Sequence, residues 1–216
     1  MLCGRDDPAL NGLHTCHGTL LDGDHLPSGP FSSPSNMVDA MILELRTYDF
    51  APGDALRYLD IFAPEGLPLI TRHLPLAGYW LSEVGVLNRL RHMWVYSSLE
   101  ERTEKRAQFM ADTEWTQGFL PRGMALIQRQ ATQLIVPDTI SDHTQSVLKN
   151  ATKPHEAHSG AHLRNDWAAL STVPLDGALF AGTVVAGEDV GSTLSIFPSA
   201  AMPSLELMRP CAFSPL

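Results

Sequence analysis

Three bulky side chains in the middle of the chain could act together. His92, Trp94 and Tyr96 alternate along Leu90–Tyr96, so a β-strand there would place all three on one face. A histidine on such a face can serve as a general base or a proton donor, because its pKa lies near neutral pH. His92 is therefore the candidate catalytic residue.

Other residues near this strand are candidates for ligand binding rather than for catalysis. Arg46 alternates along Met41–Phe50 and could hold an anionic group or pair with Glu44. Trp80 and Trp94 could stack on a flat ligand. Equally, Glu44, Arg46 and His92 could form a hydrogen-bonded network inside an interface, because buried polar groups must be satisfied. The candidate substrate-binding residues are Arg46, Arg72, His73, Trp80, Trp94 and Tyr96.

The local patterns predict the elements that position these residues. Met41–Phe50 alternates as a strand, and "APGD" then ends it, with Asp54 as the expected cap of a helix. Pro64 and Pro68 interrupt that helix. A hairpin follows, in which "LAGYWLSEVG" and "LRHMWVY" are the strands and Asn88 is a turn residue.

A second helix and a last strand complete the middle of the chain. Ser98 and Glu101 form a capping box, and the charged run from Glu100 to Arg106 predicts a solvated helix face. A short helical piece is expected to close at Pro121 and Gly123. "ALIQRQATQLIVP" then predicts a strand that stops at Pro137.

The resulting order, β-α-β-β-α-β, is the ferredoxin-like plan of the α+β class. We expect Leu43, Leu45, Met93 and Val95 to face the helices. The opposite sheet face would carry Glu44, Arg46, Tyr48, His92, Trp94 and Tyr96. Large aromatic side chains on an open face mark an interface. Two such sheets packed face to face would cover them, so the sequence predicts a homodimeric barrel.

The middle of the chain resembles the NIPSNAP family, a branch of the dimeric α+β barrel proteins. The resemblance rests on "ELRTYDFAPGDALRYLDIF", "EGLPLITRHL", "LAGYWLSEVGVLNRLRHMWVYSSLEER" and "ADTEWTQGFLP", in that order. It implies a ferredoxin-like protomer and a barrel dimer. It also implies that Arg72 and His73 lie near the helix–sheet cleft where related barrels bind small substrates, although a helix C-terminal capping role is equally open.

The second half of the chain departs from this pattern. Residues 138–176 are polar and predict a linker with a short helix around Leu163 to Leu170. Gly177–Pro198 predicts a β-hairpin that faintly echoes the "GYW…E.G" stretch. The terminal "RPCAFSPL" resembles the tail that follows the last strand in the family, so either an insertion or a truncated second repeat precedes it. The predicted division is an extension at 1–36, a NIPSNAP-like domain at 41–137, a linker at 138–176 and a degenerate repeat or tail at 177–216.

Composition excludes several classes of function. The formal net charge of -9 argues against general nucleic-acid binding, and no apolar run approaches the ~20 residues of a membrane-spanning helix. Three cysteines without framework spacing favour a reducing compartment, so a cytoplasmic location is expected. Cys3, His14, Cys16 and His17 fit no standard zinc pattern, and residues 1–36 are expected to be disordered or to precede the true start.

Two functions follow from these observations. The first is a homodimeric barrel that binds a small, largely apolar molecule, as a cofactor-independent oxygenase or isomerase. The second is a non-enzymatic protein-interaction module, favoured by the absence from the sequence of a P-loop, nucleophile elbow, dinucleotide turn or HExxH motif. No metal or cofactor is predicted, with a haem enzyme as a third option.

Overall fold

The structure is a computed structural model that describes residues 41–173, 176–200 and 203–216. The predicted N-terminal extension, with its cysteines and histidines, lies outside these residues. The alternating segment at the start forms strand β1, Ile42–Phe50, which pairs antiparallel with β3 and β4. β1 therefore lies in the middle of its sheet, between two neighbours.

The first half of the barrel is a ferredoxin-like unit. Its strands stand in the order β4-β1-β3-β2, and its elements are β1, α1 (Asp54–Ile61), η2 (Phe62–Gly66), α2 (Leu67–Thr71), β2 (Leu76–Val84), β3 (Arg89–Tyr96), α3 (Leu99–Ala111), η3 (Glu114–Phe119), α4 (Leu120–Met124) and β4 (Ile127–Ile140). This is the predicted β-α-β-β-α-β order. We call α1–η2–α2 the first helical arm and α3–η3–α4 the second.

The second half forms another sheet with the same internal order. After α5 (Asp142–Asn150) come β5 (Ala168–Ser171), β6 (Phe180–Ala186), β7 (Thr193–Phe197) and β8 (Glu206–Pro210), arranged as β8-β5-β7-β6. In this sheet β5, β6, β7 and β8 occupy the positions that β1, β2, β3 and β4 occupy in the first sheet. Among the described residues of the connections 172–179 and 198–205 there is no helix. The second half therefore has the strand order of a ferredoxin-like sheet, and the interpretation of it as a degenerate repeat stays a prediction.

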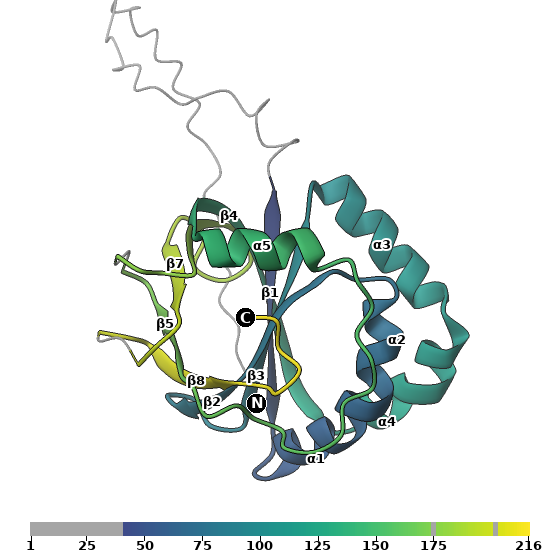
Figure 1. Cartoon of the computed structure of the whole chain (residues 1–216). Helices are drawn as coiled ribbons and strands as arrows, with labels where there is room; N and C mark the ends of the chain where they lie inside the picture. The colour runs from purple at the N-terminus through teal and green to yellow at the C-terminus, as the bar shows by residue number, and fades with distance from the viewer. Residues whose placement is uncertain (1–40, 174–175, 201–202) are drawn as a thin grey trace, which may run out of the picture. The chain divides into compact units, whose positions relative to one another are not determined.

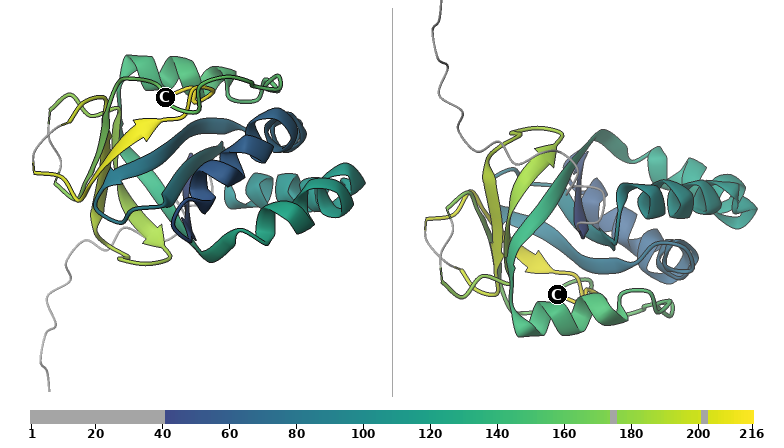
Figure 2. Two further views of the ribbon diagram at one scale, coloured as in Figure 1. Left: turned by 90° about the horizontal axis from the view of Figure 1, so that it is seen from below. Right: turned by 90° about the horizontal axis from the view of Figure 1, so that it is seen from above.

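The two sheets close into one barrel within a single chain. β2 pairs with β8, and β4 pairs with β6, so the eight strands form a closed ring. Figures 1 and 2 show the two arms on one side of the barrel and β5, β7 and β8 on the other. The expectation that a second chain is needed to complete the barrel is therefore wrong, because the C-terminal half takes that place. Association of two chains through another surface stays a prediction.

The assignment of the two sheet faces is also wrong. Leu43, Leu45 and Met93 point into the barrel, where they pack with Leu170 and Ile196 of the second half. The opposite face carries Tyr79, Trp94 and Tyr96, which pack under the helical arms instead. Both faces are buried, so alternation alone could not tell which one the helices cover.

Both arms contain a π-helical turn, η2 in the first and η3 in the second. Pro64 lies inside η2, where the wider turn accommodates a residue that has no N–H to donate. In the second arm Pro121 lies in the first turn of α4 and does not end it. The helix α1 begins after Gly53, whose φ of 87° puts it in the left-handed region, so Asp54 is the first helical residue and not the cap.

The segment expected to be a linker contains two elements. The helix α5 follows β4 directly and packs Val147 and Leu148 against the barrel interior. The residues expected to form a helix around Leu163 to Leu170 instead contain strand β5. β4 continues through Pro137 to Ile140, with a register irregularity between Pro137 and Thr139. The predicted hairpin at Gly177–Pro198 is confirmed as β6 and β7.

Candidate ligand-binding cavity under the helical arms

A cavity of about 260 Å³ lies between the first sheet and the two helical arms. We call it the arm cavity. Its walls come from β1, β3, β4 and both arms, and it is lined by Arg46, Tyr48, Ile70, His92, Trp94, Arg106, Phe109, Met110, Trp115, Leu120, Met124 and Gln130. Apolar and aromatic side chains make up most of this lining, with a few polar groups among them, as is usual for small-molecule sites.

The strand register brings the predicted polar residues together. Arg46 and His92 are directly opposite each other in the β1–β3 ladder, and their side chains share the face that carries the arms. Trp94 is two residues from His92, so it lies on the same face. The predicted convergence of Arg46, His92 and Trp94 is therefore seen in the structure, on the helix-covered face and not inside the barrel.

His92 is held in one tautomer by its neighbours. Its ring is stacked on Tyr79 with a centroid distance of 4.9 Å and meets the edge of Tyr48 at 4.6 Å. The indole Nε1–H of Trp94 donates to His92 Nδ1 at 2.8 Å. Because an indole nitrogen can only donate, Nδ1 must accept, and the proton of the neutral ring lies on Nε2.

The charge state of His92 follows from the same environment. Burial holds the pKa of His92 well below its usual range, and the charges of Arg46 and Arg106 act in the same direction. The ring is therefore neutral at neutral pH, and Nε2–H has no hydrogen-bond partner in the part of the chain that the structure describes. In this tautomer His92 is a hydrogen-bond donor and not a base.

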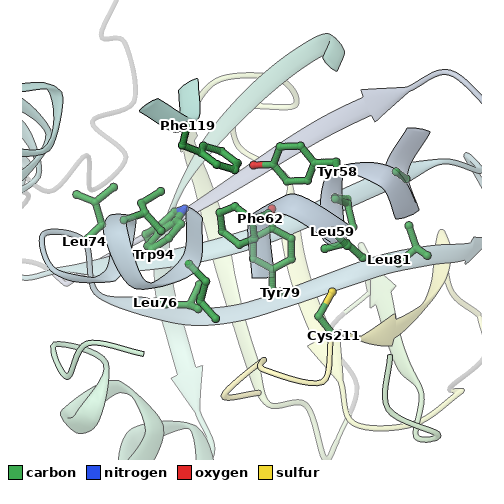
Figure 3. Close-up of a cluster of buried hydrophobic side chains, with 14 of the residues drawn as sticks. Tyr58, Leu59, Phe62, Leu74, Leu76, Tyr79, Leu81, Trp94, Phe119 and Cys211 are labelled. Atoms are coloured by element: carbon green, nitrogen blue, oxygen red, sulfur yellow. The ribbon is translucent and has the colours of Figure 1, made fainter. Parts of the chain in front are cut away.

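The hydrophobic core beneath the cavity fixes this arrangement. Figure 3 shows Tyr79 and Trp94 in one cluster with Tyr58, Phe62 and Phe119 from the arms. The Trp94 side chain is fully buried, so the indole cannot rotate away from His92 without disrupting the core.

A buried carboxylate with three arginines borders the cavity. Glu44 is fully buried and accepts from Arg102 Nη2 at 2.7 Å and from Arg106 Nη2 at 2.8 Å. Arg46 Nη1 lies 3.6 Å from the same carboxylate, and its Nη2 donates to Gln130 at 3.0 Å. Burial alone would raise the pKa of Glu44, but hydrogen bonds and charge from Arg102 and Arg106 outweigh it and lower that pKa. The cluster therefore carries three positive charges and one negative charge.

The far wall of the cavity is flat and apolar. Trp115 packs against Phe109 with a centroid distance of 4.5 Å and stacks on Phe119 at 4.8 Å. Met110 and Met124 complete this wall. Flexible methionines beside fixed aromatic rings can adapt to ligands of different outline.

The comparisons with known proteins agree with the predicted family. The NIPSNAP family model matches residues 43–142. A NIPSNAP family protein with unknown function from Agrobacterium tumefaciens is 37% identical, with 48% of this chain and 94% of that chain covered and a TM-score of 0.46. The chain belongs to the NIPSNAP family.

Other relatives match the same part of the chain. An uncharacterized NIPSNAP domain protein from Burkholderia xenovorans is 32% identical, covers 46% of this chain and 97% of that one, and has a TM-score of 0.44. Human protein NipSnap homolog 3A is 32% identical over 48% of this chain. The chain spans 42% of the length of that curated relative. Every residue that lines the arm cavity lies within the NIPSNAP match, whereas β5–β8 lie beyond it.

Four of the predicted binding residues do not line the arm cavity. Arg72 pairs with Glu114, and His73 Nε2 lies 2.8 Å from Asp112 Oδ2, so both tie the first arm to the second. The indole of Trp80 lies on the face of the first sheet opposite to the helical arms and packs inside the barrel. Tyr96 lies in the core near the end of β3, beside a separate groove.

The predicted network of Glu44, Arg46 and His92 is only partly present. Glu44 and Arg46 are paired, but His92 bonds to Trp94 instead. The prediction of a solvated helix face on α3 is wrong for Arg102 and Arg106, because both side chains reach the buried Glu44. Within the same charged run, Glu101 pairs with Lys105 four residues on, at 3.6 Å.

Sequence reasoning missed several residues of the cavity. Arg106 lies in a charged run that is typical of a solvated helix face. Gln130 lies in a long strand, and the sequence does not show which strands are next to it. Trp115 packs against Phe109, and one side of it also faces the cavity. A usable signal was the pair of arginines four residues apart on the helix after β3, together with a glutamate on β1, the strand that pairs with β3.

Among the described residues no group of histidine, cysteine or acidic side chains is placed to hold a metal ion. In the same part of the chain, no helix has the length and apolar character needed to cross a membrane.

Proposed function

We propose that this protein binds a small, flat, largely apolar molecule in the arm cavity. The observation that carries the proposal is a cavity of about 260 Å³ whose walls are two indoles, a phenylalanine and two methionines, with His92 and two arginines on one side. Such a lining favours an aromatic or polycyclic ligand with one polar end.

The polar side of the cavity stabilises negative charge. The Nε2–H of His92 and the guanidinium groups of Arg46 and Arg106 are donors, and the tautomer of His92 excludes it as the base. An isomerase or a cofactor-independent oxygenase that forms an enolate or phenolate needs donors at the oxygen that becomes charged. We extend the proposal to a reaction of this class on a substrate that has already lost its proton to solvent before it binds, with His92 as the donor to the charged oxygen.

The binding proposal is tested with 2-naphthamide, a flat neutral probe, by calorimetry. Leu120 lines the cavity, so Leu120→Trp would fill it, whereas Leu99→Trp places the same side chain on the exposed part of α3. We expect binding to wild type and to Leu99→Trp and its loss in Leu120→Trp. Binding that survives in Leu120→Trp would place the probe elsewhere and overturn the proposal.

The alternative is a protein-interaction module, and one observation favours it. The β2–β3 hairpin exposes Val84, Val86 and Leu87, with Leu87 60% exposed. Leu205, which is also 60% exposed, adjoins it because its carbonyl oxygen approaches Gly85. This apolar end of the barrel is the surface through which we propose the predicted homodimer to form. Light scattering at micromolar concentration should give a dimer for wild type and a monomer for Leu87→Lys; a wild-type monomer would refute a homodimer through this surface.

A further inference from the structure

The charges around the arm cavity do not balance. Among the described residues, Glu44 is the only acidic partner of Arg46, Arg102 and Arg106, and each of these arginine side chains is only 17–24% exposed. Three positive charges therefore share one carboxylate in a region with little water. Such an arrangement is costly unless another anion completes it.

The excess charge faces the cavity. Arg46 and Arg106 line it, whereas Arg102 bonds to the opposite oxygen of Glu44 and does not. None of the described residues that line the cavity is acidic. Arg46 Nε is buried without a hydrogen-bond partner in the described part of the chain, and the same is true of Nε2 of His92, a residue that is 3% exposed. Both are donors, so the site lacks an acceptor.

We propose that the ligand of the arm cavity is an aromatic carboxylate, whose carboxylate group is received by Arg46 and Arg106 with His92 beside them. The ring system would lie against Trp115 and the two methionines. A carboxylate suits the two arginines because it accepts from each and supplies the missing negative charge. This inference rests on the proposed binding function and specifies the class of ligand.

The test compares two probes of nearly equal shape that differ in charge. At pH 7, 2-naphthoate is an anion and 2-naphthamide is neutral. Calorimetry on wild type should show that naphthoate binds at least about tenfold more tightly, the preference expected when one hydrogen bond becomes charge-assisted. This preference should weaken as salt concentration rises, because the charges are partly exposed.

Variants assign the preference to the cavity. Arg46→Gln and Arg106→Met should abolish it, and Arg46→Lys should retain most of it. Arg102→Met is the matched control, because it removes a partner of Glu44 without changing the cavity lining, and it should leave the preference intact. A preference lost equally in Arg102→Met would show that the cluster acts only through folding and would overturn the assignment.

The outcomes separate this inference from the proposed function. If both probes bind wild type equally, the cavity binds ligands but the carboxylate inference is refuted. If neither probe binds at millimolar concentration, both the inference and the proposed function fail. Because the comparison of probes uses wild-type protein, it does not depend on the folding of any variant.

Discussion

Replacing the buried carboxylate of Glu44 by an amide tests the electrostatic account of the site. In Glu44→Gln the guanidinium groups of Arg102 and Arg106, which lie 2.7–2.8 Å from the carboxylate, lose their anionic partner. Breaking a buried ion pair from one side costs about 3–5 kcal/mol. The side chains of the three arginines around Glu44 are 17–24% exposed, so solvent screens their charges in part. We therefore expect the loss of unfolding free energy to lie at the lower end of this range, about 3 kcal/mol.

The assay is urea denaturation of wild type and Glu44→Gln, with Lys105→Met as the control. Lys105 is paired with Glu101 at 3.6 Å on the surface, so its removal should cost less than about 1 kcal/mol. Since the folded state lowers the pKa of Glu44, its contribution is present above the unfolded pKa of about 4.3 and is lost as the pH falls through the folded value. The two curves should therefore converge in acid. A loss below about 1 kcal/mol at pH 7 would refute the reasoning.

The remaining predictions concern the barrel and the histidine. In Gly182→Ala the new Cβ would lie 2.5 Å from the Val136 carbonyl oxygen, so we expect a loss of about 1–3 kcal/mol in denaturation, whereas Gly118→Ala, with nothing within 4 Å, should not destabilise. The pKa of His92 is lowered on folding, so the unfolded chain binds its proton first, and stability should fall below about pH 6.5 by roughly 1.4 kcal/mol per pH unit. His92→Phe should remove that part of the slope; an unchanged slope would contradict a buried neutral ring. Inside the barrel, Arg91 Nε donates to buried Glu206 at 2.6 Å, so Glu206→Gln should lower the unfolding free energy by about 3 kcal/mol, and a melting temperature equal to wild type would contradict this.

Local pattern was sufficient for the first half of the fold. Alternation along Met41–Phe50 and Leu90–Tyr96 located two strands, and their pairing placed Arg46 opposite His92. The turn at Asn88 was also predicted, and its φ of 56° explains why an asparagine suits it. The two strands and the turn depend on residues close together in the sequence, whereas the pairing of Arg46 with His92 joins two distant segments.

The predictions that were wrong concern contacts between residues that lie far apart in the sequence. The face of β3 that meets the helices could not be chosen, because a second sheet buries the other face equally well. β5 has four residues, Ala168–Ser171, which are too few for a periodic pattern, and its role follows only from pairing with β7 and β8. Arg102 and Arg106 reach a glutamate 58 and 62 positions away, which a helix pattern cannot reveal.

One chain closes a barrel that was expected to need two, because the second half supplies a sheet with the same strand order as the first. The hairpin of β6 and β7 occupies the position that β2 and β3 occupy in the first half. Only the first half retains helical arms among the described residues. The barrel therefore carries one arm cavity in the described part of the chain, and β5–β8 serve to bury the inner face of the sheet that carries it.

The central claim is that a ligand binds in the arm cavity, and the chain's four tryptophans provide an internal test. Trp94 and Trp115 line the cavity, whereas Trp80 lies inside the barrel and Trp167 is 38% exposed elsewhere. The measurement is the NMR spectrum of the indole N–H groups during titration with 2-naphthoate. The account predicts that the Trp94 and Trp115 signals shift with one common affinity while the Trp80 and Trp167 signals stay in place. Shifts confined to Trp80 and Trp167, or no shift at saturating probe, would contradict it.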